Sequence, residues 1–221
     1  MINLPNENYD VSVDHESDIK EFAESLPRGL PIIELGGGLG IVSCYINNLL
    51  KPISHKIVEA NPALITQIMK RRDENKCSFE VLNYALSYTA PKIMFNIDMS
   101  PVASSEKRSG SQTITKRIEI PTIRLRDLVN EKVIVFCDIE GNEIDLIDSD
   151  IKVLKKKVTY FIVEFHERIS GRWQIKKSLL KLWLNGFRVL EKYNKGKTCP
   201  SYLLFNKTLV KVSRRTENNN L

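Results

Sequence analysis

Two acidic side chains follow an apolar run in the second half of the chain. Asp138 and Glu140 come directly after residues 133–137, which are apolar and mostly β-branched, and Gly141 comes next. Such a run predicts a buried strand, and charged groups at the end of a buried strand need partners or a ligand. A carboxylate at this position can accept the proton of a reacting hydroxyl group. We therefore treat Asp138 and Glu140 as candidates for catalysis.

A glycine-rich loop follows the first apolar run. The segment ELGGGLG, residues 34–40, contains Glu34, Gly36, Gly38 and Gly40. These glycines allow a tight turn and a close approach to a ligand, and the helix that follows offers free N–H groups. The spacing differs from the dinucleotide pattern G-x-G-x-x-G because the third glycine comes one residue early. It suits a nucleoside-type ligand without a pyrophosphate, although a purely structural turn is the alternative.

The second apolar run ends in EANP, with Glu59, Ala60, Asn61 and Pro62. A carboxylate at the end of this strand can accept hydrogen bonds from both hydroxyl groups of a ribose. Asn61 and Pro62 are typical of a helix cap and first turn. We expect Glu59, Ala60 and Asn61 to contact a cofactor, while an ordinary surface acid before a helix is the alternative.

Two further runs end in polar or small residues. Asn83 and Ala85 end the third run, beside the place where an adenine would lie if the ribose binds at Glu59. Glu164 and His166 end the fifth run. His166 is a second candidate for accepting a proton, and both residues are candidates for binding the acceptor.

The periodicity predicts strands that alternate with helices. Helices are expected at 15–26, 41–50, 62–75, 142–154 and 173–185, with a short helical turn at 127–130. Strands are expected at 31–37, from 55, and at 78–86, 92–99, 114–125, 132–137, 158–166, 187–193 and 201–206. This order predicts an α/β, Rossmann-like fold, with a mostly parallel sheet, helices on both faces and an antiparallel edge. In such sheets ligands bind beyond the carboxyl ends of the strands, where the candidate residues converge.

The length of 221 residues suits one domain. Within 1–221 we expect an N-terminal helical segment at 1–28, a hairpin with a lid loop at 92–125 and a flexible tail at 208–221. The loop is rich in small polar residues, so Ser104 and Ser105 are candidates for hydrogen bonds to a sugar.

Composition excludes several classes of protein. The net charge is +6, but the basic residues are dispersed, which argues against binding to nucleic acid. The four cysteines form no C-x-x-C pair and there are three histidines, so a zinc site is not expected. No apolar run approaches the ~20 residues of a membrane span, and the polar N terminus predicts a cytoplasmic protein.

Taken together, these motifs resemble the FkbM family of class I S-adenosylmethionine-dependent methyltransferases. The resemblance covers roughly residues 30 to 190 and rests on four segments: ELGGGLG at 34–40, EANP at 59–62, DIEGNE at 138–143 and EFH at 164–166. It implies the class I fold, with a seven-stranded sheet, and S-adenosylmethionine as the cofactor. Three positions depart from the family pattern: Glu34 replaces Asp, Gly38 replaces Asn, and Phe136 replaces a common Lys.

The resemblance implies that Asp138 faces the methyl group and the acceptor hydroxyl. Asp138 and Glu140 are expected to point the same way, because alternate residues of a strand share a face. Glu143 is expected mainly to stabilise the N terminus of a helix. Oxygen ligands from Asp138, Glu140 and Glu164 would suit Mg²⁺, but a reaction without metal is the interpretation favoured by the sequence.

The resulting hypothesis is an O-methyltransferase that acts on a hydroxyl group, by resemblance that of a sugar in a glycan or of a glycosylated small molecule. The alternatives are an N-methyltransferase of protein or nucleic acid and a module that binds the cofactor without catalysis. The [D/N]-P-P-[Y/F] motif of enzymes that methylate base amines is absent after the fourth run. A nicotinamide oxidoreductase is disfavoured by the glycine spacing.

Overall fold

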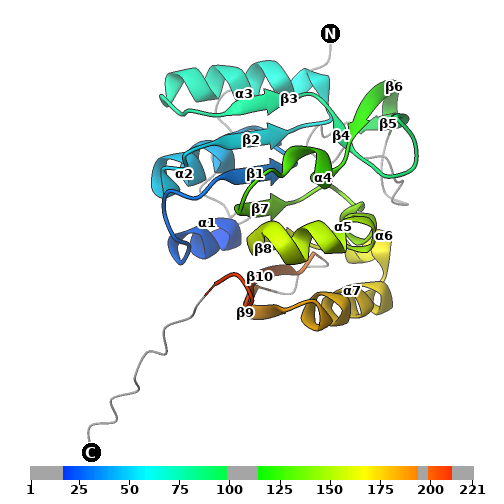
Figure 1. Cartoon of the computed structure of the whole chain (residues 1–221). Helices are drawn as coiled ribbons and strands as arrows, with labels where there is room; N and C mark the ends of the chain where they lie inside the picture. The colour runs from blue at the N-terminus through cyan, green and yellow to red at the C-terminus, as the bar shows by residue number, and fades with distance from the viewer. Residues whose placement is uncertain (1–16, 99–113, 194–198, 211–221) are drawn as a thin grey trace, which may run out of the picture.

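The computed structural model describes residues 17–98, 114–193 and 199–210. Seven strands form the central sheet, in the order β3-β2-β1-β7-β8-β10-β9 (Figure 1). Their bounds are Ile32–Leu35 (β1), His55–Val58 (β2), Glu80–Leu82 (β3), Val133–Cys137 (β7), Val158–Glu164 (β8), Phe187–Tyr193 (β9) and Ser201–Asn206 (β10). Strand β10 runs antiparallel to both β8 and β9, and the other pairs are parallel. The predicted seven-stranded sheet with an antiparallel edge pair is confirmed, and the reversed strand lies one place inside the edge.

Helices cover both faces of the sheet. Their bounds are Ser17–Glu24 (α1), Ile41–Leu50 (α2), Pro62–Glu74 (α3), Leu125–Leu128 (α4), Glu143–Lys157 (α5), Glu167–Ser170 (α6) and Arg172–Leu184 (α7). Helices α1 and α2 pack on one face and α4, α5 and α7 on the other. The short helix α6 has no counterpart among the helices predicted from the sequence.

The alternation of side chains along the strands explains the two cores. Ile33 and Leu35 of β1 lie in register with Val135 and Cys137 of β7, and all four pack in the core beneath α4, α5 and α7. Ile32 points to the opposite face and packs against α1 and α2. At roughly 25 cal/mol per Å² of buried apolar area, these two layers dominate the stability of the fold. They fix where the carboxyl ends of β1 and β7 lie.

The predicted strand at 78–86 is wrong as a single strand. It divides into β3 and the short β4, Ala85–Leu86, which leaves the main sheet and pairs in parallel with β6, Ile114–Ile123. Strand β6 also pairs with β5, Lys92–Asp98, so the predicted antiparallel hairpin is confirmed. Tyr84 N–H donates to the carbonyl oxygen of Leu82, which turns the chain between β3 and β4. The predicted lid loop, with Ser104 and Ser105, lies outside the described residues, as does most of the predicted tail.

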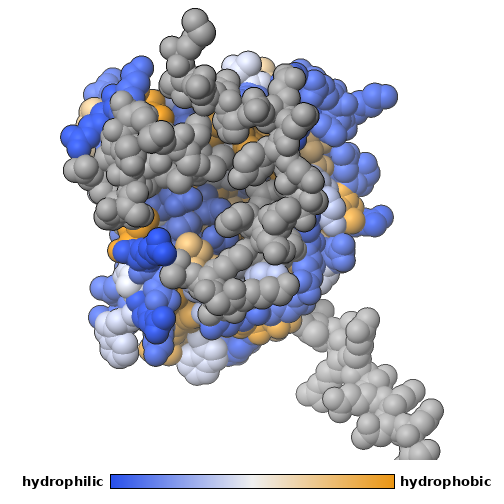
Figure 2. Space-filling view, turned by 180° about the vertical axis from the view of Figure 1, so that it is seen from behind, coloured by the Kyte–Doolittle hydropathy of each residue, from blue (hydrophilic) through white to orange (hydrophobic). Residues whose placement is uncertain are grey.

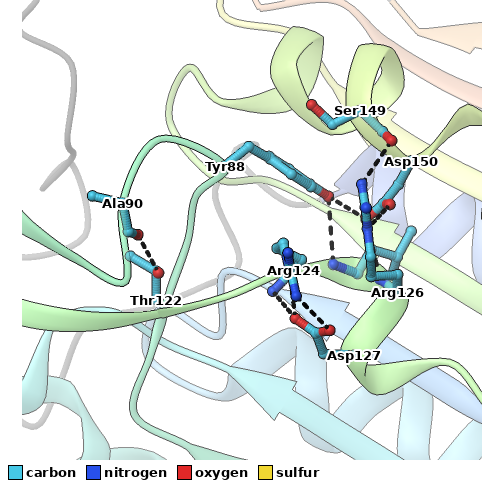
Figure 3. A network of polar contacts seen from close by, with 9 residues as sticks. Tyr88, Ala90, Thr122, Arg124, Arg126, Asp127, Ser149 and Asp150 are labelled. Carbon is cyan, nitrogen blue, oxygen red and sulfur yellow. Dashed lines mark hydrogen bonds and ion pairs between the residues drawn. The ribbon is translucent and has the colours of Figure 1, made fainter.

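A polar network links the end of β4 to helices α4 and α5 (Figure 3). Asp150 of α5 is buried, and its carboxylate accepts hydrogen bonds from the hydroxyl of Tyr88 at 2.7 Å and from the backbone and side chain of Arg126. Arg126 also donates to the carbonyl oxygen of Ser149. Burial and the bond to Asp150 raise the pKa of the Tyr88 hydroxyl. The network therefore fixes α5, whose first turn lies in the candidate site.

The strands β1, β2 and β7 point toward the same side of the molecule, where β5, β6 and α6 lie (Figure 1). On the face seen from behind, hydrophilic residues predominate and the apolar residues in view are scattered among them (Figure 2). None of the helices in the described part of the chain has the length and apolar character needed to cross a membrane.

Candidate active site at the carboxyl edge of the sheet

The glycine loop and Asp138 are in direct contact. Gly36 has a φ of 90°, and a Cβ atom on it would lie 1.7 Å from the carbonyl oxygen of Asp138. Asp138 N–H in turn donates to the carbonyl oxygen of Leu35 at 2.9 Å. Only glycine fits at Gly36, because both its backbone conformation and the close approach exclude a side chain. The first glycine therefore brings the loop after β1 against the start of the loop after β7.

Glu59 holds the middle of the glycine loop. Its Oε2 accepts the N–H of Gly38 at 2.9 Å and its Oε1 accepts the N–H of Asn61 at 2.7 Å. Burial raises the pKa of Glu59 to about 7, although the hydrogen bonds from Asn61 and Gly38 act in the opposite direction. Gly38 itself has a φ of 51°, and apart from its chain neighbours no atom of the described residues lies within 4 Å of the place where its Cβ would be. Within the described part of the chain, this side of the loop has room for a ligand.

Asn61 and Asn83 support the end of β2 rather than extending from it. Asn61 caps α3, because its Oδ1 accepts the N–H of Ala63 at 3.1 Å. The amide of Asn83 donates to the carbonyl oxygens of Glu59, at 2.9 Å, and Ala60, at 3.2 Å. Ala85 is buried in a small core under the hairpin, and the partly buried Ala60 packs against it. These residues lie around Glu59 as expected, and their contact with a cofactor stays a prediction.

Glu34 lies behind the glycine loop. The side chain is buried on the face that α2 covers, where Oε1 accepts the hydroxyl of Ser43 at 2.8 Å and Oε2 lies 3.2 Å from Nε2 of His55. Both carboxylate oxygens thus have protein partners that join β1, β2 and α2. The sequence reasoning missed Ser43 and His55, although a buried acid within a strand is itself a signal that buried polar partners exist.

The loop after β7 brings the predicted catalytic residues together, but not through strand alternation. Strand β7 ends at Cys137, and Glu140 has a φ of 53°, which places it in a turn with left-handed backbone. This conformation is uncommon for a residue other than glycine and tends to occur at functional sites. The expectation that Asp138 and Glu140 share a strand face is therefore wrong, although both side chains reach the same histidine.

His166, which follows β8, is surrounded by three carboxylates. Its Nε2 lies 3.2 Å from Oε2 of Glu140 and 3.6 Å from Oδ1 of Asp138, and its Nδ1 lies 2.9 Å from Oε1 of Glu143. Burial acts to lower the pKa of His166, but the hydrogen bond to Glu143 and the charges of Asp138, Glu143 and Glu140 raise it to about 11. The three carboxylates around the ring therefore favour the protonated, cationic form of the imidazole.

The four side chains differ in how far they reach solvent. The side chain of Asp138 is 50% exposed and that of Glu140 27%, whereas His166 is 9% and Glu143 0% exposed. A reacting group entering the site can therefore reach Asp138 first. Glu143 lies behind His166, where its Oε1 also accepts the N–H of Gly141 at 3.0 Å. Sequence reasoning assigned Glu143 mainly to the helix terminus and missed its contact with His166.

Glu164, at the end of β8, lies close to His166 as well. Its Oε2 is 3.2 Å from the hydroxyl of Ser201, and one donor atom each of Glu164, His166 and Cys199 lies within 4.8 Å of the others. Two surface hollows, of about 390 and 450 Å³, are lined by none of the predicted site residues. The first adjoins the Tyr88 region of Figure 3, so neither hollow identifies the place of a cofactor.

Comparisons with known proteins agree with this fold. Among solved structures, the fold is similar to that of an rRNA methylase from Streptococcus thermophilus, with 8% identity and a TM-score of 0.53, over 88% of this chain and 97% of that one. It is also similar to a ribosomal-protein methylase from Lactobacillus delbrueckii subsp. bulgaricus, with 13% identity and a TM-score of 0.52, over 86% and 78% of the two chains. The fibrillarin pre-rRNA processing protein of Methanococcus jannaschii gives 13% identity and a TM-score of 0.51, over 81% and 67%. At these identities the likeness concerns the fold alone.

The sheet order, the glycine loop and the carboxylates at the strand ends define a Rossmann-like methyltransferase fold. The profile of the Methyltransferase FkbM domain matches residues 42–190, which is more than half of the chain. The chain belongs to the FkbM methyltransferase family. A search of the curated proteins finds no match. The profile match begins after the glycine loop, so the role of Gly36, Gly38 and Gly40 depends on the geometry described above.

Proposed function

We propose that this methyltransferase uses S-adenosylmethionine to methylate a hydroxyl group, and that the acceptor is a sugar of a glycan or of a glycosylated metabolite. The observation that carries the proposal is the half-exposed carboxylate of Asp138 beside the glycine loop. It is the most exposed member of a charged cluster whose other groups are largely buried. A proton acceptor in this position suits an alcohol, which must lose its proton as the methyl group is transferred.

The cofactor is assigned to the open side of the glycine loop. In this arrangement a ribose hydroxyl donates to Glu59, the adenine lies near Asn83 and Ala85, and the methionine part passes Gly38 toward Asp138. The carboxylate of Glu59 accepts backbone N–H groups of Gly37, Gly38 and Asn61, and of its roughly four lone-pair sites one remains for a hydroxyl donor. The donor supplies an electrophilic methyl group on a sulfonium, so alignment with the acceptor oxygen is the main requirement.

The charged cluster then has separate roles for its members. Asp138 accepts the proton of the acceptor hydroxyl while the oxygen forms a bond to the methyl carbon and the carbon–sulfur bond breaks. His166, held by Glu143 at Nδ1, keeps Asp138 and Glu140 in place through ion pairs that its Nε2 side makes with both carboxylates. Glu164 and His166 are assigned to the side from which the acceptor enters. The predicted contacts of Ser104 and Ser105 with a sugar concern residues outside the described part of the chain.

The alternative acceptor class is an amine of a protein or of a nucleic acid. The net charge of +6 is compatible with an anionic polymer, but the basic residues are dispersed along the chain, so the hydroxyl acceptor is preferred. A cofactor-binding module without catalysis is the remaining alternative. It is disfavoured by a complete set of carboxylates around His166.

The test is transfer of a labelled methyl group. The purified chain is incubated with S-adenosylmethionine carrying a labelled methyl and, in separate reactions, with glycans, glycosylated small molecules, total RNA and a ribosomal protein fraction. Label that enters a sugar and is stable as an ether supports the proposal, and Asp138→Asn should abolish it. Label in RNA or protein amines alone, or equal turnover by the Asp138→Asn variant, would refute it.

A further inference from the structure

Helix α7 has apolar side chains on two opposite faces. Ile175 and Leu182 are buried against the sheet. Trp173, Leu180 and Leu184 follow one another at spacings of seven and four residues, which places them on one line of the helix surface. Two positions along a helix correspond to about 200°, so this line lies opposite Leu182. The core of the chain therefore accounts for only one of the two faces.

The second face is exposed at one end of the sheet, opposite α3 (Figure 1). The exposed fractions are 67% for Trp173, 57% for Leu180, 53% for Trp183 and 66% for Leu184. Of the nine large apolar side chains exposed in the described part of the chain, these four lie on α7 and two more on β9, the strand that follows it. With roughly 200 Å² in each tryptophan side chain, the four on α7 expose on the order of 500 Å², about the size of the largest apolar patch on a soluble protein, which is often functional.

Basic residues accompany the exposed apolar ones. Helix α7 contains no Asp or Glu, and its basic residues are Arg172, Lys176, Lys177 and Lys181. Nζ of Lys177 lies 5.8 Å from the ring centroid of Trp173. The guanidinium group of Arg188, in β9, lies 4.9 Å from the ring centroid of Trp183. The face is therefore both apolar and cationic.

Acidic neighbours cancel only part of this charge. Glu167 pairs with Arg172, and Asp148 pairs with Lys181 at 2.7 Å. In the described part of the chain, three of the five basic residues on α7 and at Arg188 thus remain to give the face a net positive charge. Its complement is an apolar surface with negative charge at its boundary.

We propose that the outer face of α7, formed by Trp173, Lys177, Leu180, Trp183 and Leu184, docks on a membrane that contains anionic lipids. A helix of this kind lies in the plane of the interface, where leucine enters the acyl boundary, tryptophan lies at the headgroups and basic residues attract anionic lipids. This inference goes beyond the proposed function and does not depend on it. Helix α7 begins six residues after His166, so its first turn lies toward the edge of the sheet that carries the candidate site.

Two other occupants fit this face less well. A second copy of the chain, related by a two-fold axis, would bring the same basic residues against one another. A single-stranded nucleic acid would match the charge, but it binds by stacking its bases on aromatic rings, and leucines offer no such surface.

The tryptophans make the proposal directly testable, because Trp173 and Trp183 are the only two in the sequence. The full chain is titrated with vesicles of equal parts phosphatidylcholine and phosphatidylglycerol, and in parallel with vesicles of phosphatidylcholine alone. We expect a blue shift of the tryptophan emission and co-sedimentation with the anionic vesicles, and binding to the neutral vesicles at least 10-fold weaker. The double variant Lys176→Gln and Lys177→Gln should weaken binding about 30-fold, since each basic residue near an anionic surface contributes about 1 kcal/mol.

Leu180→Gln tests the apolar part of the face and should weaken binding about 10-fold or more. Its matched control is Ile53→Gln, at an apolar residue that is 71% exposed between α2 and β2, and this variant should bind as the unmodified chain does. Circular dichroism checks that each variant is folded.

Three results would overturn the proposal: no binding of the folded chain to anionic vesicles, equal binding to both kinds of vesicle, or equal weakening by Leu180→Gln and Ile53→Gln. A change of tryptophan emission caused by RNA, or by dimerisation at high protein concentration, without binding to vesicles would also overturn it. Such a result would assign the face to a nucleic acid or to a second copy of the chain.

Discussion

Glu59 gives the sharpest quantitative prediction, because its ionisation changes near neutral pH. Burial raises the pKa of this carboxyl from 4.5 to about 7 in the folded chain. The ionised form is the better acceptor for a ribose hydroxyl of the proposed cofactor. Binding should therefore favour ionised Glu59 and release a proton at pH values below 7.

The expected size follows from the ionised fraction. With a pKa of about 7, roughly a tenth of the molecules carry ionised Glu59 at pH 6 and roughly nine tenths at pH 8. The dissociation constant for S-adenosylmethionine should therefore be about 10-fold larger at pH 6 than at pH 8. Calorimetric titration at pH 6, 7 and 8 measures the affinity, and repetition in buffers of different ionisation enthalpy measures the released proton.

The matched variant is Glu59→Gln. Glutamine can accept from only one of the two N–H groups of Gly38 and Asn61, so its absolute affinity will fall. Its affinity should not, however, depend on pH through this position. The account of Glu59 is refuted if the unmodified chain binds equally well at pH 6 and pH 8, or if Glu59→Gln retains the same pH dependence.

Stability of the chain without cofactor should show the opposite trend. Because the folded pKa lies above the unfolded value, the contribution of Glu59 to stability is fully present below pH 4.5 and is lost as the pH rises through about 7. Glu59→Gln should thus gain stability relative to the unmodified chain between pH 5 and pH 8, by a few kcal/mol at most, since a shift of one pKa unit corresponds to about 1.4 kcal/mol. Urea unfolding at the two pH values measures this difference.

Three further changes test other parts of the site. Gly36→Ala places a Cβ 1.7 Å from the carbonyl oxygen of Asp138 and should lower the free energy of unfolding by about 3 kcal/mol or more, measured in urea. The control Gly171→Ala, at a φ of 75° but with space for a Cβ among the described residues, should lower it by about 1 to 2 kcal/mol. Equal losses of stability in the two variants would contradict the close contact at Gly36. Asp138→Asn should reduce the rate of methyl transfer at least 100-fold, while the affinity for S-adenosylmethionine, measured by calorimetry, stays within a few-fold of that of the unmodified chain. Equal losses of rate and affinity would show that Asp138 binds the donor instead. Asp150→Ala leaves Arg126 and Tyr88 without their shared partner and should lower the free energy of unfolding by about 2 to 4 kcal/mol, measured by thermal unfolding. Unchanged stability would show that the network of Figure 3 does not stabilise the fold.

Local patterns in the sequence were sufficient to predict the main sheet. The apolar runs that become β1, β2, β7 and β8 are short, bounded by glycine, proline or acids, and separated by helical periodicity, so each local signal agrees with the final fold. Because these strands are predicted correctly, the sequence also predicts that Glu59 and Asp138 lie at strand ends. Where local and tertiary preferences coincide, prediction from one sequence succeeds.

The errors arise where contacts distant in the sequence decide the local structure. The run 78–86 alternates like one strand, but the amide of Asn83 binds the carbonyl oxygens of Glu59 and Ala60, and the chain turns there toward β6. Glu140 adopts left-handed backbone that no local pattern requires. Its contact with His166 depends on the pairing of β7 with β8.

Only part of the cluster around His166 could be predicted, because some of its contacts also depend on residues distant in the sequence. Asp138, Glu140 and His166 stand at the ends of neighbouring strands, which the parallel sheet brings together. Glu143 reaches His166 only because α5 begins directly after the turn at Glu140 and packs its first turn inward. A sequence pattern can place a residue at a helix terminus, but the direction of its side chain depends on the packing of that helix.

The central claim is that the glycine loop and Glu59 hold S-adenosylmethionine beside Asp138. The most direct test is calorimetric titration of the purified chain with S-adenosylmethionine, with NAD titrated in parallel. The account predicts one site per chain with micromolar affinity for S-adenosylmethionine and no binding of NAD. Binding of NAD alone, or of neither ligand to a chain shown to be folded, would contradict the assignment of the loop and with it the proposed methyl transfer.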